Sequence, residues 1–194
     1  MSDLPQDDID WINDNLHLTV IVPETWEARA KKLRASRDSE AALANTRLKD
    51  AKRWVGLLAE YYTGSYFKEL LEDNNKGDWQ AKHDFTHKIS KKRMDVKSNN
   101  GYKDYENDAY FTVLKDACDW EAYDYLILCW YGLTNRQMCI RGWVSKTAVL
   151  SEAKSFPVGA NYSYFGQKEI VLSQSVFQIP SSMLTSMPRL KDLI

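Results

Sequence analysis

The sequence predicts a single α+β domain in which helices come first and a mixed β-sheet follows. The length of 194 residues fits one domain with a sizeable core. Residues 25–73 are rich in helix-forming Ala, Leu, Lys, Arg and Glu. Residues 78–194 instead carry alternating, β-prone runs that polar turns separate. We therefore expect an acidic N-terminal arm over residues 1–24 and one domain over residues 25–194, helical at first and then rich in sheet.

The first structured segments surround a proline. Residues 16–22 have the β-branched and apolar pattern of a short strand, which Pro23 would end. Thr25 is a suitable N-cap for a helix that begins at Trp26. The polar residues 36–39 predict a break, after which Asp38 or Ser39 would cap a second helix.

A second helix is predicted from the spacing of its apolar residues. Trp54, Leu58 and Tyr62 recur every four residues and so share one helical face. Gly64 is expected to interrupt this helix, and a shorter helical turn should then run to Leu71.

The remainder reads as strands bounded by polar turns. One ambiguous stretch, residues 109–120, is also compatible with a helix. A short helical turn is expected after Pro180. The predicted strands cover residues 79–86, 93–98, 109–114, 123–131, 138–149 and 169–179.

Composition excludes several classes of protein. Apolar residues make up 44% of the chain and charged residues 27%, which is typical of a folded domain. No apolar run is long enough to cross a bilayer, and no basic segment followed by an apolar stretch marks a leader. The cysteines Cys118, Cys129 and Cys139 form no Cys-x-x-Cys pair, so we expect a reducing compartment, the cytoplasm of a bacterial or phage-infected cell.

A net charge of −1 hides an uneven distribution of charge. Residues 1–24 hold six acidic and no basic side chains. Residues 25–53 carry a local charge of +5, and residues 82–97 carry +4. Two positive surfaces are what a protein needs to hold a phosphate backbone, so DNA is a candidate partner.

The tripeptide Asp95-Val96-Lys97 carries the clearest chemical signal. On a strand, Asp95 and Lys97 leave the same face while Val96 points into the core. A carboxylate can hold a hard divalent cation, and a neighbouring lysine can orient a water molecule and offset phosphate charge. This pairing suits metal-dependent hydrolysis of phosphodiesters.

A second carboxylate, Asp84, lies upstream at hairpin distance. If residues 83–98 form a hairpin that turns around Ser90, Asp84 is expected opposite Lys97 and Thr86 opposite Asp95. A slip of one residue would send Asp84 to the other face and destroy the site.

These residues resemble the motif of the PD-(D/E)XK nuclease superfamily, whose fold is the restriction-endonuclease-like fold. Asp84 resembles the first acid and Asp95-Val96-Lys97 the (D/E)-x-K tripeptide, while Glu60 resembles the acid of the preceding helix. The resemblance covers roughly residues 50–131. His83 stands where the family often has a proline, and the chain lacks the cysteine cluster of the iron–sulfur exonuclease subtypes.

The resemblance implies a Mg²⁺-dependent endodeoxyribonuclease with a mixed central sheet that helices precede and flank. Asp84, Asp95, Glu60 and the Val96 carbonyl would hold Mg²⁺, for which Mn²⁺ can substitute. Lys97 would position the attacking water and help to remove its proton. The family also often forms homodimers.

Each of these residues also has a plain structural interpretation. Asp95 and Lys97 could form a weak surface ion pair, Asp84 could cap a turn, and Glu60 could lie on an exposed helix face. His83 and His87 could flank the site, and half a zinc site is a weaker alternative. A cluster of basic residues at the predicted turn could contact DNA or only water: Lys88, Lys91, Lys92 and Arg93.

Two other functions compete with an endonuclease. A non-catalytic module for DNA binding or protein interaction could keep the same fold and use its basic faces alone. An accessory protein of a phage or mobile element could act on branched DNA junctions.

Overall fold

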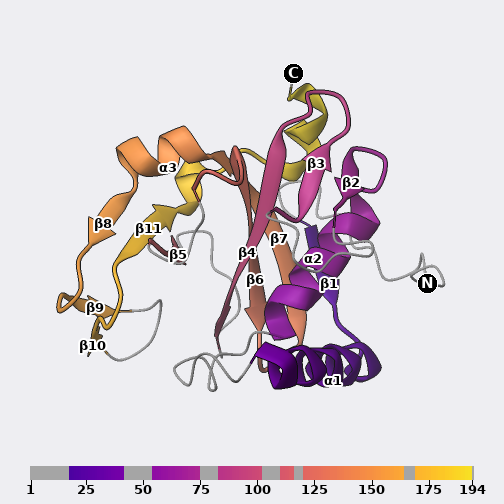
Figure 1. The fold of residues 1–194 in the computed structure, drawn as a ribbon, viewed down its shortest axis with the longest axis horizontal. Coiled ribbons are helices and arrows are strands. Elements are labelled where there is room, and N and C mark those ends of the chain that lie inside the picture. The colour runs from indigo at the N-terminus through magenta and orange to yellow at the C-terminus, as the bar shows by residue number, and fades with distance from the viewer. Residues whose placement is uncertain are drawn as a thin grey trace.

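The computed structural model describes residues 18–41, 54–74, 83–101, 110–115, 120–163 and 169–193. Residues 1–17 of the predicted acidic arm, residues 42–53 of the predicted second helix and the first half of the strand predicted over residues 79–86 lie outside these ranges. The architecture is mixed α+β (Figure 1).

A six-stranded mixed sheet forms the centre of the fold. Only β4 and β6 run parallel within it, and the other neighbouring strands are antiparallel. In spatial order the strands are β1 (Leu18–Ile21), β7 (Gln137–Ser145), β6 (Tyr125–Gly132), β4 (Arg93–Gly101), β3 (Phe85–His87) and β2 (Leu71–Asp73).

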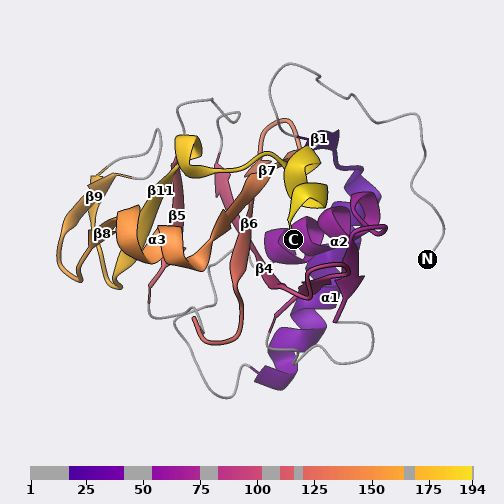
Figure 2. The same ribbon diagram turned by 90° about the horizontal axis from the view of Figure 1, so that it is seen from above.

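Two helices, α1 (Glu24–Ala41) and α2 (Trp54–Tyr66), lie on one side of this sheet (Figure 2). Helix α2 buries Val55, Leu58, Ala59 and Tyr62, which recur at helical spacing and share one core with side chains of β4 and β6. The last 3₁₀ helix, Met187–Asp192, adds Met187 and Leu190 to this core.

The other side of the sheet carries a second, smaller sheet. Its order is β5 (Tyr110–Leu114), β11 (Val176–Pro180) and β8 (Lys154–Phe156). Helix α3 (Lys146–Glu152) follows β7 directly, and the hairpin of β9 (Asn161–Ser163) and β10 (Glu169–Val171) extends this lobe. Figure 2 shows β4, β6 and β7 between the α1–α2 side and the α3–β8–β11 side.

Strand β6 joins the two cores because both of its faces are buried. Ile127, Cys129 and Tyr131 belong to the core beneath α2. Leu126, Leu128 and Trp130 belong to the core beneath β5 and β11. A continuous apolar run of this kind is typical of a central strand, and the strand predicted over residues 123–131 is confirmed.

The helix predictions need three corrections. Helix α1 begins at Glu24 rather than after a Thr25 cap, because the Pro23 carbonyl already accepts bonds from the N–H groups of Trp26 and Glu27. It continues through residues 36–39, since polar residues lower helix propensity by only a few tenths of a kcal/mol each. Helix α2 passes through Gly64, because this glycine packs against the Phe85 ring.

The strand predictions also need corrections. Leu71 begins β2 instead of ending a helical turn. Strand β7 ends at Ser145, because the Ser145 hydroxyl caps α3 by accepting a bond from Ala148 N–H. The strand predicted over residues 169–179 is divided into β10 and β11 by an intervening turn. Residues 110–114 are a strand, so the helical alternative is wrong there.

The start of the chain's described part is integrated into the fold. Leu18 and Val20, which fall in the predicted arm, are buried in β1 beside β7. Within the described ranges, no helix combines the length and the apolar character that spanning a membrane requires.

Candidate active site

The hairpin of β3 and β4 decides which side chains meet. Its observed register pairs Phe85 with Met94 and Thr86 with Arg93. The expected pairing of Thr86 with Asp95 is therefore wrong by two residues along the strand. A shift of two preserves the faces, because side chains alternate with a period of two. Asp84 is thus carried to the same face of the hairpin as Asp95, as the sequence predicted.

Asp95 and Lys97 lie on the face of β4 that turns away from α2. Met94 and Val96 point the opposite way, into the core beneath that helix. Asp95 is buried, and its Oδ2 lies 2.5 Å from Nζ of Lys97. This oxygen is buried, and among the described residues its partner is the ammonium group of Lys97. A buried carboxylate held by one ammonium group is not a weak surface pair.

Asp84 reaches β4 from the beginning of β3. Its Oδ2 accepts a hydrogen bond from the backbone N–H of Val96 at 2.7 Å. This bond holds the Asp84 carboxylate against the peptide bond between Asp95 and Val96. The Asp84 carboxylate and the Asp95–Lys97 ion pair are therefore attached to the same stretch of β4, where β3 and β4 separate.

The donor set fits a hard divalent cation with few protein ligands. Carboxylate oxygens are the ligands that Mg²⁺ prefers, and this ion commonly uses one or two carboxylates together with water and phosphate. The buried Oδ2 of Asp95, which no hydrogen bond satisfies, is the atom that a cation would most readily engage. Among the described residues, no three His, Cys, Asp or Glu side chains are grouped closely enough to hold a metal ion by themselves.

Glu60 lies in α2, on the side of the sheet where that helix packs. A Cβ placed on Gly56 would lie 3.9 Å from Oε1 of Glu60 and 4.0 Å from Oγ of Ser98. Glu60 therefore lies on the side of β4 opposite to Asp95 and Lys97, and among the described residues it does not complete a group of three acidic side chains with Asp84 and Asp95.

The basic residues in and beside the turn between β3 and β4 differ in what their side chains contact. Lys88, Lys91 and Lys92 are exposed. Lys88 Nζ donates to the carbonyl of Lys68 at 2.5 Å, and Lys91 adopts a left-handed backbone with φ of 58°. Arg93 differs from the three lysines, because its guanidinium binds a carboxylate, although its side chain is 40% exposed.

Arg93 and Asp124 tie the start of β4 to the start of β6. The Nε and Nη2 atoms of Arg93 bind the two carboxylate oxygens of Asp124 at 3.2 and 2.9 Å, and Nη1 donates to the carbonyl of Glu121. The backbone N–H of Arg93 also donates to Asp124 Oδ2 at 2.9 Å. The Arg93 side chain lowers the pKa of Asp124 to about 2. This fork fixes the parallel pairing that places Asp95 and Lys97.

Three further polar residues surround the site, and sequence reasoning assigned them no role or only a loose one. His83 Nε2 lies 3.2 Å from the Thr86 hydroxyl, which also exchanges hydrogen bonds with the amide of Asn74. Burial, aided by the positive charge of Arg93, lowers the pKa of His83, and the negative charge of Asp95 acts against this shift. A contact between Asn74 and Thr86 depends on the pairing of β2 with β3, which residue types alone do not indicate.

His83 and His87 have separate partners rather than a common one. His87 is fully buried, and its Nδ1 lies 2.9 Å from the hydroxyl of Ser90 in the turn. His83 contacts Thr86 instead. The weaker zinc alternative thus gains no support from the described contacts.

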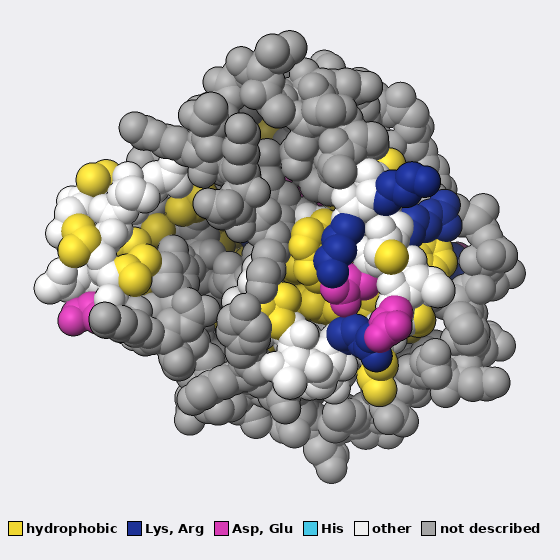
Figure 3. Space-filling view, turned by 90° about the horizontal axis from the view of Figure 1, so that it is seen from below, with side chains coloured by type: hydrophobic (Ala, Val, Ile, Leu, Met, Phe, Trp, Pro, Cys, Tyr) yellow, Lys and Arg dark blue, Asp and Glu magenta, His cyan; other side chains and the backbone are white. Residues whose placement is uncertain are grey.

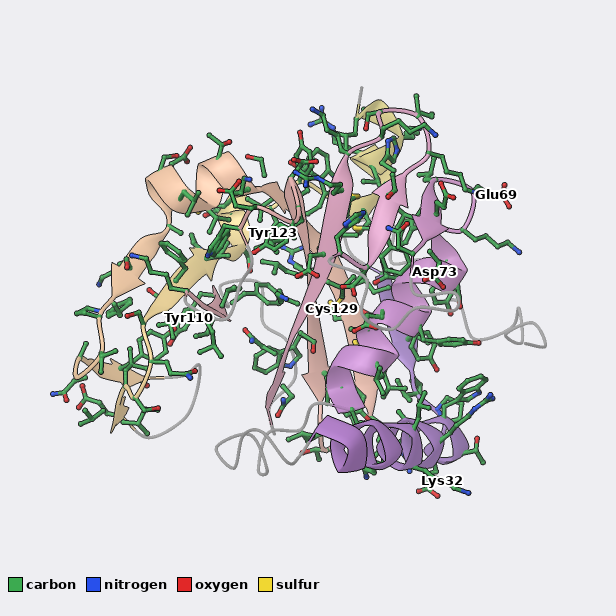
Figure 4. All side chains as sticks on the ribbon, in the orientation of Figure 1. Lys32, Glu69, Asp73, Tyr110, Tyr123 and Cys129 are labelled. Carbon is green, nitrogen blue, oxygen red and sulfur yellow. The ribbon has the colours of Figure 1, made fainter. Side chains whose placement is uncertain are left out.

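The same face of β4 continues beyond Lys97 to Asn99. The side-chain amide of Asn99 pairs with the backbone of Thr112 in β5, at 2.9 Å to its carbonyl and 2.7 Å from its N–H. Thr112 in turn lies 2.7 Å from the hydroxyl of Tyr162 in β9. The smaller sheet is therefore anchored beside the candidate site. Figure 4 shows Tyr110 of β5 and Asp73 of β2 on opposite sides of β4.

A second charged surface lies on α1. Arg29, Lys31 and Lys32 are exposed there, with Arg29 over the Trp26 ring and Lys31 over the Trp54 ring. Seen from below, Lys and Arg side chains on this side stand beside Asp and Glu side chains (Figure 3). A pocket of about 430 Å³ opens between α1 and the turn after β6. Its charged lining is balanced, consisting of Glu24, Glu27, Lys31 and Arg136.

Comparison with protein-family models, with curated proteins and with solved structures found no match.

Proposed function

We propose that the protein is a metal-dependent endodeoxyribonuclease that hydrolyses DNA phosphodiester bonds at Asp84, Asp95 and Lys97. The observation that supports this proposal is that Asp84 bonds to the backbone of β4 between the two residues of an ion pair. Asp84 bonds to Val96 N–H, and Asp95 pairs with Lys97. Such a cluster suits a hard cation beside a phosphate.

The order of elements supports the same interpretation. The helix that carries Glu60 precedes β2, and Asp84, β3 and the acid-x-lysine strand β4 follow in that order. Strand β6 follows parallel to β4 within a mixed sheet. This is the order in which the superfamily arranges its helix acid, first acid and (D/E)-x-K tripeptide, and a restriction-endonuclease-like fold is part of the proposal.

Mg²⁺, or Mn²⁺ in its place, would be held by Asp84, Asp95 and the Val96 carbonyl. Glu60, which the resemblance implies as a further ligand, is not part of this proposal, because α2 packs on the opposite face of β4. When bound, the ion supplies Lewis-acid stabilisation of the charge that builds up on the phosphate. The two aspartates hold it against β4, and burial of Asp95 excludes competing water from that oxygen.

Lys97 has a different task. Its side chain is 35% exposed, so the ammonium group can reach a phosphate at the surface of the site. There it offsets phosphate charge and orients the attacking water in line with the scissile bond, whereas removal of a proton from that water would require the neutral amine form of Lys97. The exposed Lys88, Lys91 and Lys92 would contact the DNA backbone, which fixes position but does not read sequence.

The test is incubation of the purified protein with supercoiled, linear, branched and single-stranded DNA, with Mg²⁺, with Mn²⁺ and with a chelator. We expect nicking or cleavage of at least one substrate only when a divalent ion is present. Binding in a mobility-shift assay without cleavage under any condition would instead favour the non-catalytic DNA-binding module. A cytoplasmic location and a homodimer that cuts both strands are further parts of the proposal, and gel filtration with light scattering checks the second.

A further inference from the structure

The ion pair between Asp95 and Lys97 has the position that a metal ion would need. Nζ of Lys97 lies 2.5 Å from Oδ2 of Asp95. The side chain of Asp95 is only 11% exposed. A carboxylate this deeply buried needs a compensating charge, and the ammonium group of Lys97 provides one.

The ammonium group of Lys97 is the partner that the described residues give to Oδ2 of Asp95. This oxygen is buried, and no hydrogen-bond donor from another described residue reaches it. Its charge is therefore compensated by Lys97. Lys97 also has a flexible four-carbon stem and is partly exposed, so its ammonium group can move from Asp95 toward the surface.

An ammonium group and a divalent cation cannot occupy the same side of one carboxylate oxygen, because two positive charges at such a distance repel strongly. We propose that Lys97 holds the metal position in the ion-free protein and that cation binding at Asp95 displaces Nζ from Oδ2 toward the substrate phosphate. This inference rests on the proposed function. It makes Lys97 a regulator of metal occupancy as well as a residue that contacts substrate.

The consequence is a competition that can be measured without DNA. Removing the charge of Lys97 removes the competitor, so cation affinity should rise even though cleavage is lost. Lys97→Met keeps the apolar stem and deletes the charge. Lys97→Arg keeps the charge and therefore the competition. Lys191→Met is the matched control, because Lys191 is an exposed lysine of the last 3₁₀ helix.

The experiment titrates each purified full-length protein with Mn²⁺ and follows free Mn²⁺ by its electron paramagnetic resonance signal. We expect Lys97→Met to bind Mn²⁺ about tenfold more tightly than the wild type. Lys191→Met should bind Mn²⁺ as tightly as the wild type, and Lys97→Arg should bind it no more tightly than the wild type. Asp95→Asn should abolish Mn²⁺ binding at this site both in the wild type and in Lys97→Met. Should the methionine variant fail to fold, Lys97→Gln provides the same comparison.

The outcomes separate this inference from the proposed function. Suppose that the wild type binds Mn²⁺ and cleaves DNA, but that Lys97→Met binds Mn²⁺ no more tightly than the wild type. This result would overturn the proposed competition and would not affect the proposed nuclease function. Absence of an Asp95-dependent Mn²⁺ site from both wild type and Lys97→Met would overturn both.

Discussion

Asp84 and Val96 are joined by a hydrogen bond of 2.7 Å between the carboxylate of one and the backbone N–H of the other. Asp84 directly precedes β3, and β4 extends beyond the part that pairs with β3. The Asp84 side chain therefore accepts the bond that a backbone carbonyl of a neighbouring strand would otherwise accept. One carboxylate thus serves the backbone of β4 and faces the Asp95–Lys97 pair at the same time.

Asp84 variants should separate these two roles. Asp84→Ala leaves Val96 N–H without its partner and should destabilise the protein by about 1–3 kcal/mol. Asp84→Asn keeps an oxygen acceptor but loses the charge, so it should retain most stability and lose divalent-ion binding. Urea unfolding and Mn²⁺ titration measure the two effects. Equal stability of the alanine variant and the wild type would show that the bond contributes nothing.

Two glycines of α2 provide a test of how this helix packs on the sheet. A Cβ on Gly64 would lie 2.9 Å from the buried Phe85 ring, whereas one on Gly56 meets nothing closer than 3.9 Å. Gly64→Ala should therefore cost about 1–3 kcal/mol through overpacking. Gly56→Ala should stabilise by about 0.5–1 kcal/mol, because alanine favours a helix interior. Thermal or urea unfolding of both variants checks the contrast, and a stable Gly64→Ala protein would contradict the contact with Phe85.

The Arg93–Asp124 fork should appear in the acid stability of the protein. The pKa of Asp124 is lowered to about 2 in the folded state, from a usual value of 3.8. A carboxyl group with a lowered folded-state pKa stabilises the protein above its unfolded pKa, and the contribution is lost as the pH falls toward the folded value. The free energy of unfolding of the wild type should therefore exceed that of Asp124→Asn at pH 6, and the difference should shrink between pH 4 and pH 2. A difference that stays constant over this range would rule out the fork as its source.

His87 should act in a higher pH window. It is fully buried, and burial lowers its pKa from the usual 6.5. Because the unfolded chain then binds the proton more readily, stability is complete above about pH 6.5 and falls as the pH drops below that value. His87→Gln should be less stable than the wild type at pH 7.5, since Ser90 N–H loses the Nδ1 acceptor. The gap should narrow as the pH falls to 5, which denaturant unfolding at each pH measures, and a widening gap would contradict this account.

Much of the fold could be predicted because the spacing of apolar residues within one segment indicates whether that segment is a helix or a strand. The alternation in residues 93–98 and the apolar run over residues 123–131 each indicate a strand, and β4 and β6 confirm both. The spacing of Trp54, Leu58 and Tyr62 likewise predicts α2. These signals depend only on the period of burial.

What could not be predicted depends on contacts between distant segments. Leu71 pairs with His87 in β2 and β3, and this pairing overrides the helical preference of its neighbours. The hairpin register was wrong by two residues, because the turn is centred one residue before the expected Ser90 and Lys91. Lys91 adopts the left-handed backbone that closes this turn. The period of two still carried Asp84 to the expected face. The role of Arg93 was hidden because Asp124, its partner, lies thirty-one residues away in the sequence.

The most direct measurement of the central claim is the rate at which Mn²⁺-loaded protein nicks supercoiled plasmid, compared between wild type, Asp95→Asn and Asp192→Asn. Asp192 is an exposed carboxylate that pairs with Arg189, and it serves as the matched control. We predict cleavage by the wild type and by Asp192→Asn, and a loss of at least about a hundredfold in Asp95→Asn with folding intact by circular dichroism. Undiminished cleavage by Asp95→Asn, or none by the wild type on any DNA substrate with either ion, would contradict the assignment of Asp84, Asp95 and Lys97 as a nuclease site.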